Sequence, residues 1–548
     1  MRLRHPLEPC RRLLVVVVCL ATAPHGLPAA DRVPSPRSES RPLDRNLVLV
    51  TFDDLRYDTP GFNGGPARTP NMDRLAAAAT VFRSAMTTVG LCSPARATLF
   101  TGRYGHQTGL DDNCLTWHSR LIGLDASETT LIEWSHRAGY FVGYFGKWHL
   151  GPAGPYARGV DCPVVKAQPK RPWRPFRKPR KFQTIRRYYE PGRTFKEKPE
   201  YYGTRPGRFE DTAEFKYSQQ AIRFLEQVSQ QKRPFVLFLN YNAPHPPYVV
   251  PAPFNTIYSA DRVSLPKNFL HRSDDKPRYQ NDVLWYWHDV GHLTEQDWRR
   301  MRAHYYGFVT LADQAVGLVL RRLDELGLSD RTMVILVGDQ GSMLGEHGLY
   351  DKGPYCYEEL MRIPLVIRVP GERPGVVGRH VSIVDINQTV VDWLGLKPDP
   401  APRFSRSLLP LVRCEPDAWS EEPDVAFYRH EWYNGSWYGI RAVRTPQWKY
   451  CWNPVGIDEL YDLRHDPGEM INRINDSAAA PPRRRLQCLL LSHMKETGDP
   501  AARRFAEEAG LAKPIQRQAD PARSSRQPAP LEWPLSGHAV EGTRVAQQ

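Results

Sequence analysis

Outside its first 30 residues, the sequence lacks any apolar run long enough to cross a lipid bilayer. It also lacks internal repeats and a glycine period, which excludes a collagen-like architecture. Hydrophobic residues nevertheless make up 41% of the 548 residues, so the chain can bury a core and is not disordered throughout. This length accommodates one large α/β domain and a smaller second domain.

Cysteine is sparse, and the spacings of the nine cysteines are too wide for a zinc knuckle. Two of them lie in an N-terminal segment with the features of an export signal. Arg11 and Arg12 precede an apolar run at residues 13–20, and small residues follow up to Ala30. A buried core strand is the alternative, but the basic start favours export. We expect a signal peptide over residues 1–30 and a secreted or periplasmic protein, in which disulfides are permitted but their pairing stays open.

Acidic residues are in deficit, since 74 lysines and arginines outnumber 60 aspartates and glutamates to give a net charge of +14. Most of the excess falls in a proline-broken insertion expected over residues 152–208. Between Lys166 and Arg208, fifteen basic residues face three acidic ones, a surplus of 15 − 3 = 12. A segment of this kind binds nucleic acid or a sulfated polysaccharide, or is only a solvated loop.

Apolar segments alternate with helical patterns over residues 45–400. Strands buried on both faces are expected at 46–52, 140–145, 235–240 and 332–339, and helices at 72–82, 129–138, 212–229 and 296–326. This alternation predicts an α/β fold with a mostly parallel central sheet flanked by helices.

The remaining segments have a different character. Residues 31–44 are polar and proline-rich, which is typical of a linker. Short strands and turns, such as 448–452, predict a small α+β subdomain over residues 401–499. Residues 500–548 are polar and rich in arginine and proline, and we expect a poorly ordered tail.

Carboxylates follow two of the expected strands. Asp53 and Asp54 end the first, and Asp339 follows a later one with Gln340 beside it. In parallel sheets, ligands bind beyond the carboxyl ends of strands. Adjacent carboxylates repel each other unless a cation neutralises them, and oxygen donors favour Ca²⁺ or Mg²⁺ over Zn²⁺. Helix or turn capping is the alternative.

A candidate nucleophile lies in the segment LCSPARATLFTGR, at residues 91–103. Pro94 suits the first position of a helix, which would leave Cys92 just before the helix N-terminus. Backbone N–H groups and the helix dipole favour an anion or an ionised nucleophile there. Arg96 follows about one turn later and can reach the same anion.

This segment resembles the signature of the type I sulfatases, members of the alkaline-phosphatase-like superfamily. The resemblance runs from about residue 45 to 475. It includes GKWHLG at 146–151, APHPPY at 243–248, GDQGSMLGEHGLYDKG at 338–353 and ELYDLRHDPGE at 459–469.

The resemblance implies a modified nucleophile and a metal ion. A formylglycine-generating enzyme would convert Cys92 to formylglycine (3-oxoalanine), whose hydrate offers one hydroxyl to attack sulfur and a second to expel sulfate. Asp53, Asp54, Asp339 and Gln340 match the calcium ligands, with modified Cys92 completing the set; Mg²⁺ is less expected. Gln340 departs from the family, which more often has Asn or His there.

The resemblance also implies the residues that act on the sulfate. Arg96 would stabilise the formylglycine hydrate, and His245 or His149 would protonate the leaving alcohol. His347 we interpret as structural. The positions that match residues binding sulfate or moving protons are Lys147, His149, His245 and Lys352.

The function so implied is hydrolysis of an organic sulfate, with a sulfated carbohydrate expected as substrate and no nucleic-acid partner or membrane anchor. A phosphonate monoester or phosphodiester hydrolase, and an inactive polyanion-binding homologue, are the alternatives. The basic insertion follows Lys147 and His149, so we hypothesise that it holds a polysulfated chain. The aromatic residues available to pack on sugar rings there are Trp173, Phe176, Tyr188 and Tyr189.

Overall fold

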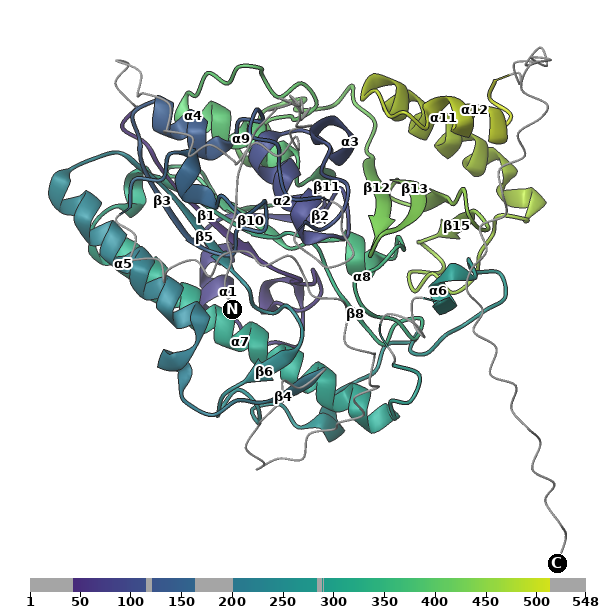
Figure 1. The fold of residues 1–548 in the computed structure, drawn as a ribbon, viewed down its shortest axis with the longest axis horizontal. Helices are drawn as coiled ribbons and strands as arrows, with labels where there is room; N and C mark the ends of the chain where they lie inside the picture. The colour runs from purple at the N-terminus through teal and green to yellow at the C-terminus, as the bar shows by residue number, and fades with distance from the viewer. Residues whose placement is uncertain (1–42, 115–120, 163–200, 283–287, 289, 513–548) are drawn as a thin grey trace, which may run out of the picture.

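The computed structural model describes residues 43–114, 121–162, 201–282, 288 and 290–512 (Figure 1). The expected signal peptide, nearly all of the linker, residues 163–200 of the basic insertion and residues 513–548 of the tail lie outside these ranges.

A seven-stranded sheet forms the centre of the molecule, in the order β11-β2-β10-β7-β1-β5-β3. Within it only β10 runs antiparallel to its neighbours, and the other pairings are parallel. The predicted mostly parallel sheet is therefore confirmed. The strands are β1 (Asn46–Phe52), β2 (Thr80–Met86), β3 (Phe141–Gly146), β5 (Phe235–Tyr241), β7 (Thr332–Gly338), β10 (Leu365–Arg368) and β11 (Gly375–Ser382).

Helices cover both faces of this sheet (Figure 1). Val48 and Val50 of β1 belong to the core under α1, α5 and α7, whereas Leu47 and Leu49 belong to the core under α2, α4 and α9. Successive strand residues point to opposite faces, which is why β1 is apolar throughout. The helices of this domain are α1 (Pro70–Ala77), α2 (Cys92–Thr101), α3 (Gly105–Thr108), α4 (Leu131–Arg137), α5 (Ala213–Gln231), α6 (Tyr279–Asp282), α7 (Glu295–Glu325), α8 (Glu358–Met361), α9 (Asp385–Leu394) and α10 (Leu409–Val412).

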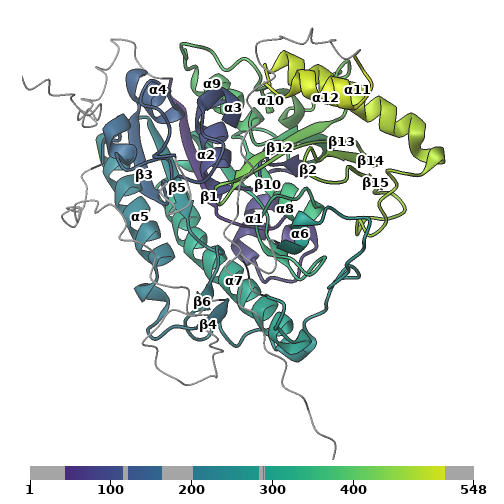
Figure 2. The same cartoon turned by 45° about the vertical axis from the view of Figure 1, so that its right-hand side comes forward.

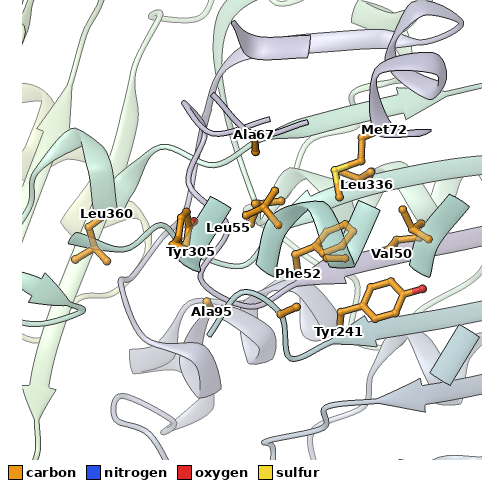
Figure 3. Close-up of a cluster of buried hydrophobic side chains, with 14 of the residues drawn as sticks. Val50, Phe52, Leu55, Ala67, Met72, Ala95, Tyr241, Tyr305, Leu336 and Leu360 are labelled. Atoms are coloured by element: carbon orange, nitrogen blue, oxygen red, sulfur yellow. The ribbon is translucent and has the colours of Figure 1, made fainter. Parts of the chain in front are cut away.

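The core reaches the end of the strands that carry the polar residues (Figure 3). Phe52, the last residue of β1, stacks on Tyr241 of β5 with ring centroids 5.3 Å apart, and Leu336 of β7 lies in the same cluster. Each is fully buried, and burial of such a side chain contributes about 1.5–3 kcal/mol. This packing fixes the backbone directly before Asp53.

The helix predicted over residues 72–82 is wrong at its end. Helix α1 stops at Ala77, and Thr80, Val81 and Phe82 begin β2. β-Branched and aromatic residues favour strands, and β2 gains partners on both sides in β10 and β11. The start of the next helix also differs from the expectation: the sequence predicts Pro94 at the first position of the helix, but α2 begins two residues earlier, at Cys92, with Leu91 as the N-cap.

A four-stranded antiparallel sheet forms the predicted smaller C-terminal subdomain, and two helices lie across it (Figure 2). Strand β14 coincides with the expected strand at 448–452. The elements are β12 (Ala426–Tyr433), β13 (Ser436–Arg444), β14 (Trp448–Trp452), β15 (Glu459–Asp462), α11 (Ala480–Glu496) and α12 (Ala502–Glu508).

The disordered tail predicted from residue 500 is wrong at its start. Helix α12 occupies its first residues, and Phe505 is fully buried against Tyr450 and Trp452. One aromatic residue in a polar segment was too weak a signal to predict this helix. Residues 513–548 lie outside the described range.

Two short ladders complete the fold: β4 (Tyr202–Thr204) pairs with β6 (Tyr248–Val250), and β8 (Met343–Leu344) pairs with β9 (Tyr350–Asp351). The β8–β9 hairpin matters for the site because Lys352 follows it directly. No helix in the described parts of the chain is both long and apolar enough to span a membrane.

Candidate active site

The two acidic strand ends lie side by side. Strands β1 and β7 pair in parallel with Phe52 opposite Gly338, so Asp53 and Asp54 lie next to Asp339 and Gln340. All four side chains are buried. The three carboxylates each place an oxygen within 4.8 Å of the others. The sheet register thus brings together four of the five residues that the sequence predicts as metal ligands, the fifth being Cys92.

Carboxylates this close share their negative charge unequally. Burial and neighbouring Asp53 raise the pKa of Asp339 well above its usual range. Burial also opposes the charge on Asp53, but Lys147 and the other cations outweigh it and hold the pKa of Asp53 well below its usual range. Opposite pKa shifts in adjacent acids are typical of functional sites.

Gln340 shows that the residues fit a cation. Its Nε2 lies 3.3 Å from Asp53 Oδ1 and 3.1 Å from Cys92 Sγ, and it also contacts Asp54. Its Oε1 is buried without a hydrogen-bond partner. If the amide were flipped, its oxygen would face the oxygens of Asp53 and Asp54, and all of these atoms are acceptors. That orientation is favourable only when a cation lies between the amide oxygen and the carboxylates. Three carboxylates and an amide oxygen are hard donors suited to Ca²⁺ or Mg²⁺.

Cys92 faces this acidic cluster from the start of α2. It is fully buried, and its Sγ lies within 4.8 Å of ligand atoms of Asp53 and His245. The backbone N–H of Ser93 donates to Asn113 Oδ1 at 2.9 Å, which anchors the first turn of the helix. The helix N-terminus thus presents residue 92 to the strand ends, where the dipole favours negative charge.

Arg96 links the nucleophile helix to the acidic cluster. Its Nε lies 2.9 Å from Asp339 Oδ2, and its Nη1 donates to Asn240 Oδ1 at 3.2 Å. Burial disfavours the charge, but Asp339 and Asp53 outweigh this and raise the pKa of Arg96. Its Nη2 is buried without a hydrogen-bond partner, which leaves a donor for an anion.

Two lysines bring positive charge from other loops. Lys147, after β3, contacts the carboxylate of Asp53. Lys352, after β9, lies 2.7 Å from Asp54 Oδ2 and 3.1 Å from Asp351 Oδ1. Burial disfavours the charge on both lysines, but the adjacent carboxylates outweigh it and raise the pKa of each. Both therefore remain protonated at neutral pH.

The two histidines have different environments. His149 is held by the carbonyl of Cys114, 3.1 Å from Nε2, and burial together with Lys147 lowers its pKa to about 3. The side chain of His245 is 34% exposed, and its Nε2 lies 4.0 Å from Asp54 Oδ2. Desolvation and Lys352 lower the pKa of His245, but the carboxylates of Asp53 and Asp54 outweigh them and raise it to about 9.

The structure adds residues that the sequence analysis missed. Asn240 is the last residue but one of β5, near the carboxyl end of the strand beside β1. Its side chain accepts from Arg96, and its carbonyl accepts from the N–H of Lys147 at 2.9 Å. Its position at a strand end could have signalled this role. Ser93 Oγ donates to the carbonyl of His149 at 2.7 Å and accepts from the N–H of Cys114 at 3.2 Å. Cys114 lies in a loop with no sequence signal.

The C-terminal subdomain borders the site through the β12–β13 turn. Tyr433 hydrogen-bonds to His288 at 2.9 Å, and both rings lie within electrostatic range of Lys352. The N–H of Gly435 donates to Asp112, whose pKa burial raises to about 6. The turn therefore contacts the loop that anchors α2. His347, by contrast, stacks on Tyr357 in the interior with ring centroids 3.9 Å apart.

A sequence model described as Sulfatase matches residues 45–396. The chain belongs to the sulfatase family. A second model, described as N-sulphoglucosamine sulphohydrolase, C-terminal, matches residues 345–496 of this sulfatase. The predicted membership of the alkaline-phosphatase-like superfamily is confirmed, and the chain is an enzyme of the sulfatase class.

The similar proteins include a sulfatase and a phosphonate monoester hydrolase. An uncharacterised sulfatase of Escherichia coli is 28% identical over 478 residues, covering 83% of this chain and 88% of its own. The phosphonate monoester hydrolase of Agrobacterium radiobacter superposes with a TM-score of 0.65 at 24% identity, covering 83% and 96%. A structure in complex with its substrate D-glucosamine-2-N,6-O-disulfate has a TM-score of 0.64 at 22% identity, covering 84% and 99%. These likenesses confirm the fold.

Proposed function

We propose that this sulfatase hydrolyses the sulfate ester of a sulfated carbohydrate, with residue 92 as the nucleophile in its formylglycine form and a calcium ion held by the acidic cluster. The ligands are Asp53, Asp54, Asp339 and Gln340, with residue 92 beside them. One observation carries the proposal: three buried carboxylates, Cys92 and three cations converge at adjacent strand ends.

The absent groups supply two kinds of chemistry. When bound, calcium would supply positive charge for the sulfate oxygens, and formylglycine at position 92 would supply a hydrated aldehyde as nucleophile. Conversion requires a formylglycine-generating enzyme, which becomes a partner during maturation. The N-terminal segment predicts export, and an exported chain would fold in a compartment where disulfides can form.

The chain's own cations bind and orient the sulfate. Arg96, Lys147 and Lys352 approach the cluster from α2, β3 and β9, so an anion placed there meets a positive group from each of three elements. Because carboxylates fix all three groups, and Arg96 and Lys352 are also buried, they are organised before the substrate binds. Such preorganised charge stabilises the negative charge that develops on the sulfuryl oxygens in the transition state.

Of the two histidines, His245 suits the proton transfer. Its ring is partly exposed beside Asp54, whereas the ring of His149 is hydrogen-bonded to the Cys114 carbonyl. An imidazole at the mouth of the site can donate a proton from Nε2 to the leaving alcohol. His149 instead holds the loop that carries Lys147.

Carbohydrate specificity is supported by the likeness to the structure bound to D-glucosamine-2-N,6-O-disulfate. It is also supported by Trp432, which is 39% exposed one residue from Tyr433 in the strand that borders the site. Indole rings pack well against the apolar faces of sugars. The likeness to a phosphonate monoester hydrolase keeps phosphonate esters as the second candidate.

A substrate comparison tests this function. The mature enzyme, with conversion of Cys92 checked by peptide mass spectrometry, is assayed on sulfated glucosamines, an aryl sulfate and an aryl phosphonate monoester. We expect kcat/KM for a sulfate ester to exceed that for the phosphonate by at least about 100-fold, a difference of roughly 2.7 kcal/mol. Chelation of divalent ions should remove the activity, and calcium should restore it. Faster turnover of the phosphonate would overturn the proposal.

His245→Ala tests the proton donor, with His149→Ala as the matched variant. Loss of a general acid costs about 10²–10⁴-fold when the leaving group is a sugar alcohol. It should cost much less for a nitrophenyl sulfate, whose leaving group needs no proton. Equal losses on both substrates would show that His245 acts in another way.

A further inference from the structure

A pair of buried thiols joins the catalytic domain to the C-terminal subdomain. Cys356 lies between Lys352 and α8, and Cys451 lies in β14, 95 residues further along the chain. Cys356 is 4% exposed and Cys451 is fully buried. Both are free thiols in the structure, and neither has a part in the chemistry proposed above.

The contacts around the two cysteines hold them together. Lys449 donates from Nζ to the carbonyl of Cys356 at 2.5 Å. Cys451 is two residues further along the same strand, so its side chain leaves β14 on the same face as Lys449. Burial and then the neighbouring Cys356 thiol raise the pKa of the Cys451 thiol. The two sulfur atoms are therefore neighbours across the junction.

The surrounding backbone is fixed on both sides of Cys356. Tyr428 of β12 donates to the carbonyl of Tyr355 at 3.1 Å, and the N–H of Glu358 donates to Glu469 at 2.8 Å. Glu358 also lies 3.3 Å from Nζ of Lys449. The segment carrying Cys356 is thus attached to the subdomain before any covalent bond forms. An S–S bond is about 2 Å long, so these contacts hold the two cysteines on facing segments from which the bond can close.

We propose that Cys356 and Cys451 form a disulfide that cross-links the two parts of the sulfatase when the chain folds in an oxidising compartment. The thiolate of one cysteine attacks the disulfide of a thiol–disulfide oxidoreductase, and the other thiolate then displaces that enzyme from the mixed disulfide. Two protons leave the thiols, two electrons reduce the oxidoreductase to its dithiol, and one S–S bond remains in the sulfatase.

The cross-link has a structural consequence for the active site. Cys356 is four residues after Lys352, whose Nζ lies 2.7 Å from Asp54. A disulfide at Cys356 fastens this segment to β14. Burial raises the pKa of Cys451, so the thiolate is scarce once the junction has closed, and exchange takes place during folding.

Peptide mass spectrometry of the full chain tests the proposal. The protein is exported to the periplasm of a bacterial host, denatured with an alkylating agent and digested without reduction. We expect a cross-linked peptide pair that contains Cys356 and Cys451. If both cysteines are recovered alkylated, or either is paired with another cysteine, the proposal is wrong. This result does not depend on whether any variant folds.

Reduction supplies an independent measurement. Treatment with a phosphine should lower the melting temperature of the exported protein by roughly 4 °C, the effect of opening a closed loop of this length in a chain of this size. Cys356→Ser and Cys451→Ser should each abolish the shift, whereas Cys414→Ser, at an exposed thiol, should preserve it. A shift that persists in both variants would contradict the assignment.

Discussion

Two charge clusters in this sulfatase differ in how positive and negative groups are arranged. At the strand ends, the three carboxylates of Asp53, Asp54 and Asp339 each place an oxygen within 4.8 Å of the others. In the second, which we call the Arg441 cluster (Asp111, Arg429, Glu431, Arg441 and Asp499), positive and negative groups alternate. Arg441 binds Asp499 through two hydrogen bonds of 2.6 and 2.9 Å.

The titration of the acids separates the two clusters. Arg441 and Arg429 outweigh the effect of burial and lower the pKa of both Asp499 and Glu431. At the strand ends, the pKa of Asp339 is raised while that of Asp53 is lowered. A cluster in which arginines lower the pKa of the carboxylates beside them stabilises the fold. A cluster in which a buried carboxylate has a raised pKa is suited to bind a cation, at some cost in stability.

The largest effect is expected on activity, from a substitution at the strand-end cluster. Cys92→Ala removes the nucleophile and should lower kcat by roughly 10⁴-fold or more, with little change in melting temperature. Cys162→Ala, also at a buried cysteine but away from the strand ends, is the control and should keep its activity. If Cys92→Ala retained turnover, the strand-end cluster would not be the catalytic centre.

The next largest effect is expected on stability, from a substitution in the Arg441 cluster. Asp499→Asn removes one of the two carboxylates paired with the buried Arg441, because Glu431 stays 2.8 Å from its Nη1. We expect the free energy of unfolding in urea to fall by about 2 kcal/mol. The kcat of the folded variant should stay close to that of the wild type. Glu507→Gln, which breaks the exposed Arg503–Glu507 pair on α12, should cost less than about 1 kcal/mol.

The contribution of Asp499 to the free energy of unfolding should also depend on pH. The pKa of Asp499 is lowered from its usual value of 3.8 to about 2 in the folded protein. Its stabilisation is therefore fully present above about pH 4 and is lost as the pH falls toward 2, a change of about 2 kcal/mol. The stability difference between wild type and Asp499→Asn should narrow over this interval. A difference that stays constant would contradict the assigned pKa.

The smallest effect concerns the basic segment outside the described residues. Replacing its lysines and arginines between residues 166 and 198 by glutamine should raise KM for a polysulfated oligosaccharide by roughly five-fold at low salt. Turnover of a small aryl sulfate should be unchanged. If the KM values of both substrates change equally, the segment does not act by binding a polyanionic chain.

The sequence predicted the parts of the molecule whose signals are local. Apolar strands of parallel type place their following residues at one sheet edge, so Asp53 and Asp339 could be assigned to one site from the residue pattern alone. The motif around Cys92 added Arg96 by helical spacing. The parallel sheet and the C-terminal subdomain followed from the alternation of elements.

Other features depend on contacts between distant residues. The start of β2 at Thr80 is decided by β10 and β11, nearly 300 residues further along the chain. Phe505 orders α12 only because Tyr450 and Trp452 lie beneath it. Likewise, no local pattern predicts the pairing of Arg441 with Asp499 or the contact of Cys356 with Cys451.

Calorimetric titration with calcium measures most directly whether the carboxylate cluster at the strand ends is a metal site. Chelator-treated full-length enzyme should bind one calcium ion per chain. Asp54→Asn should abolish that binding, and Asp58→Asn, at a nearby carboxylate paired with Arg56, should preserve it. Wild-type protein that binds no calcium, or an Asp54→Asn variant that binds it as tightly as the wild type, would contradict the account.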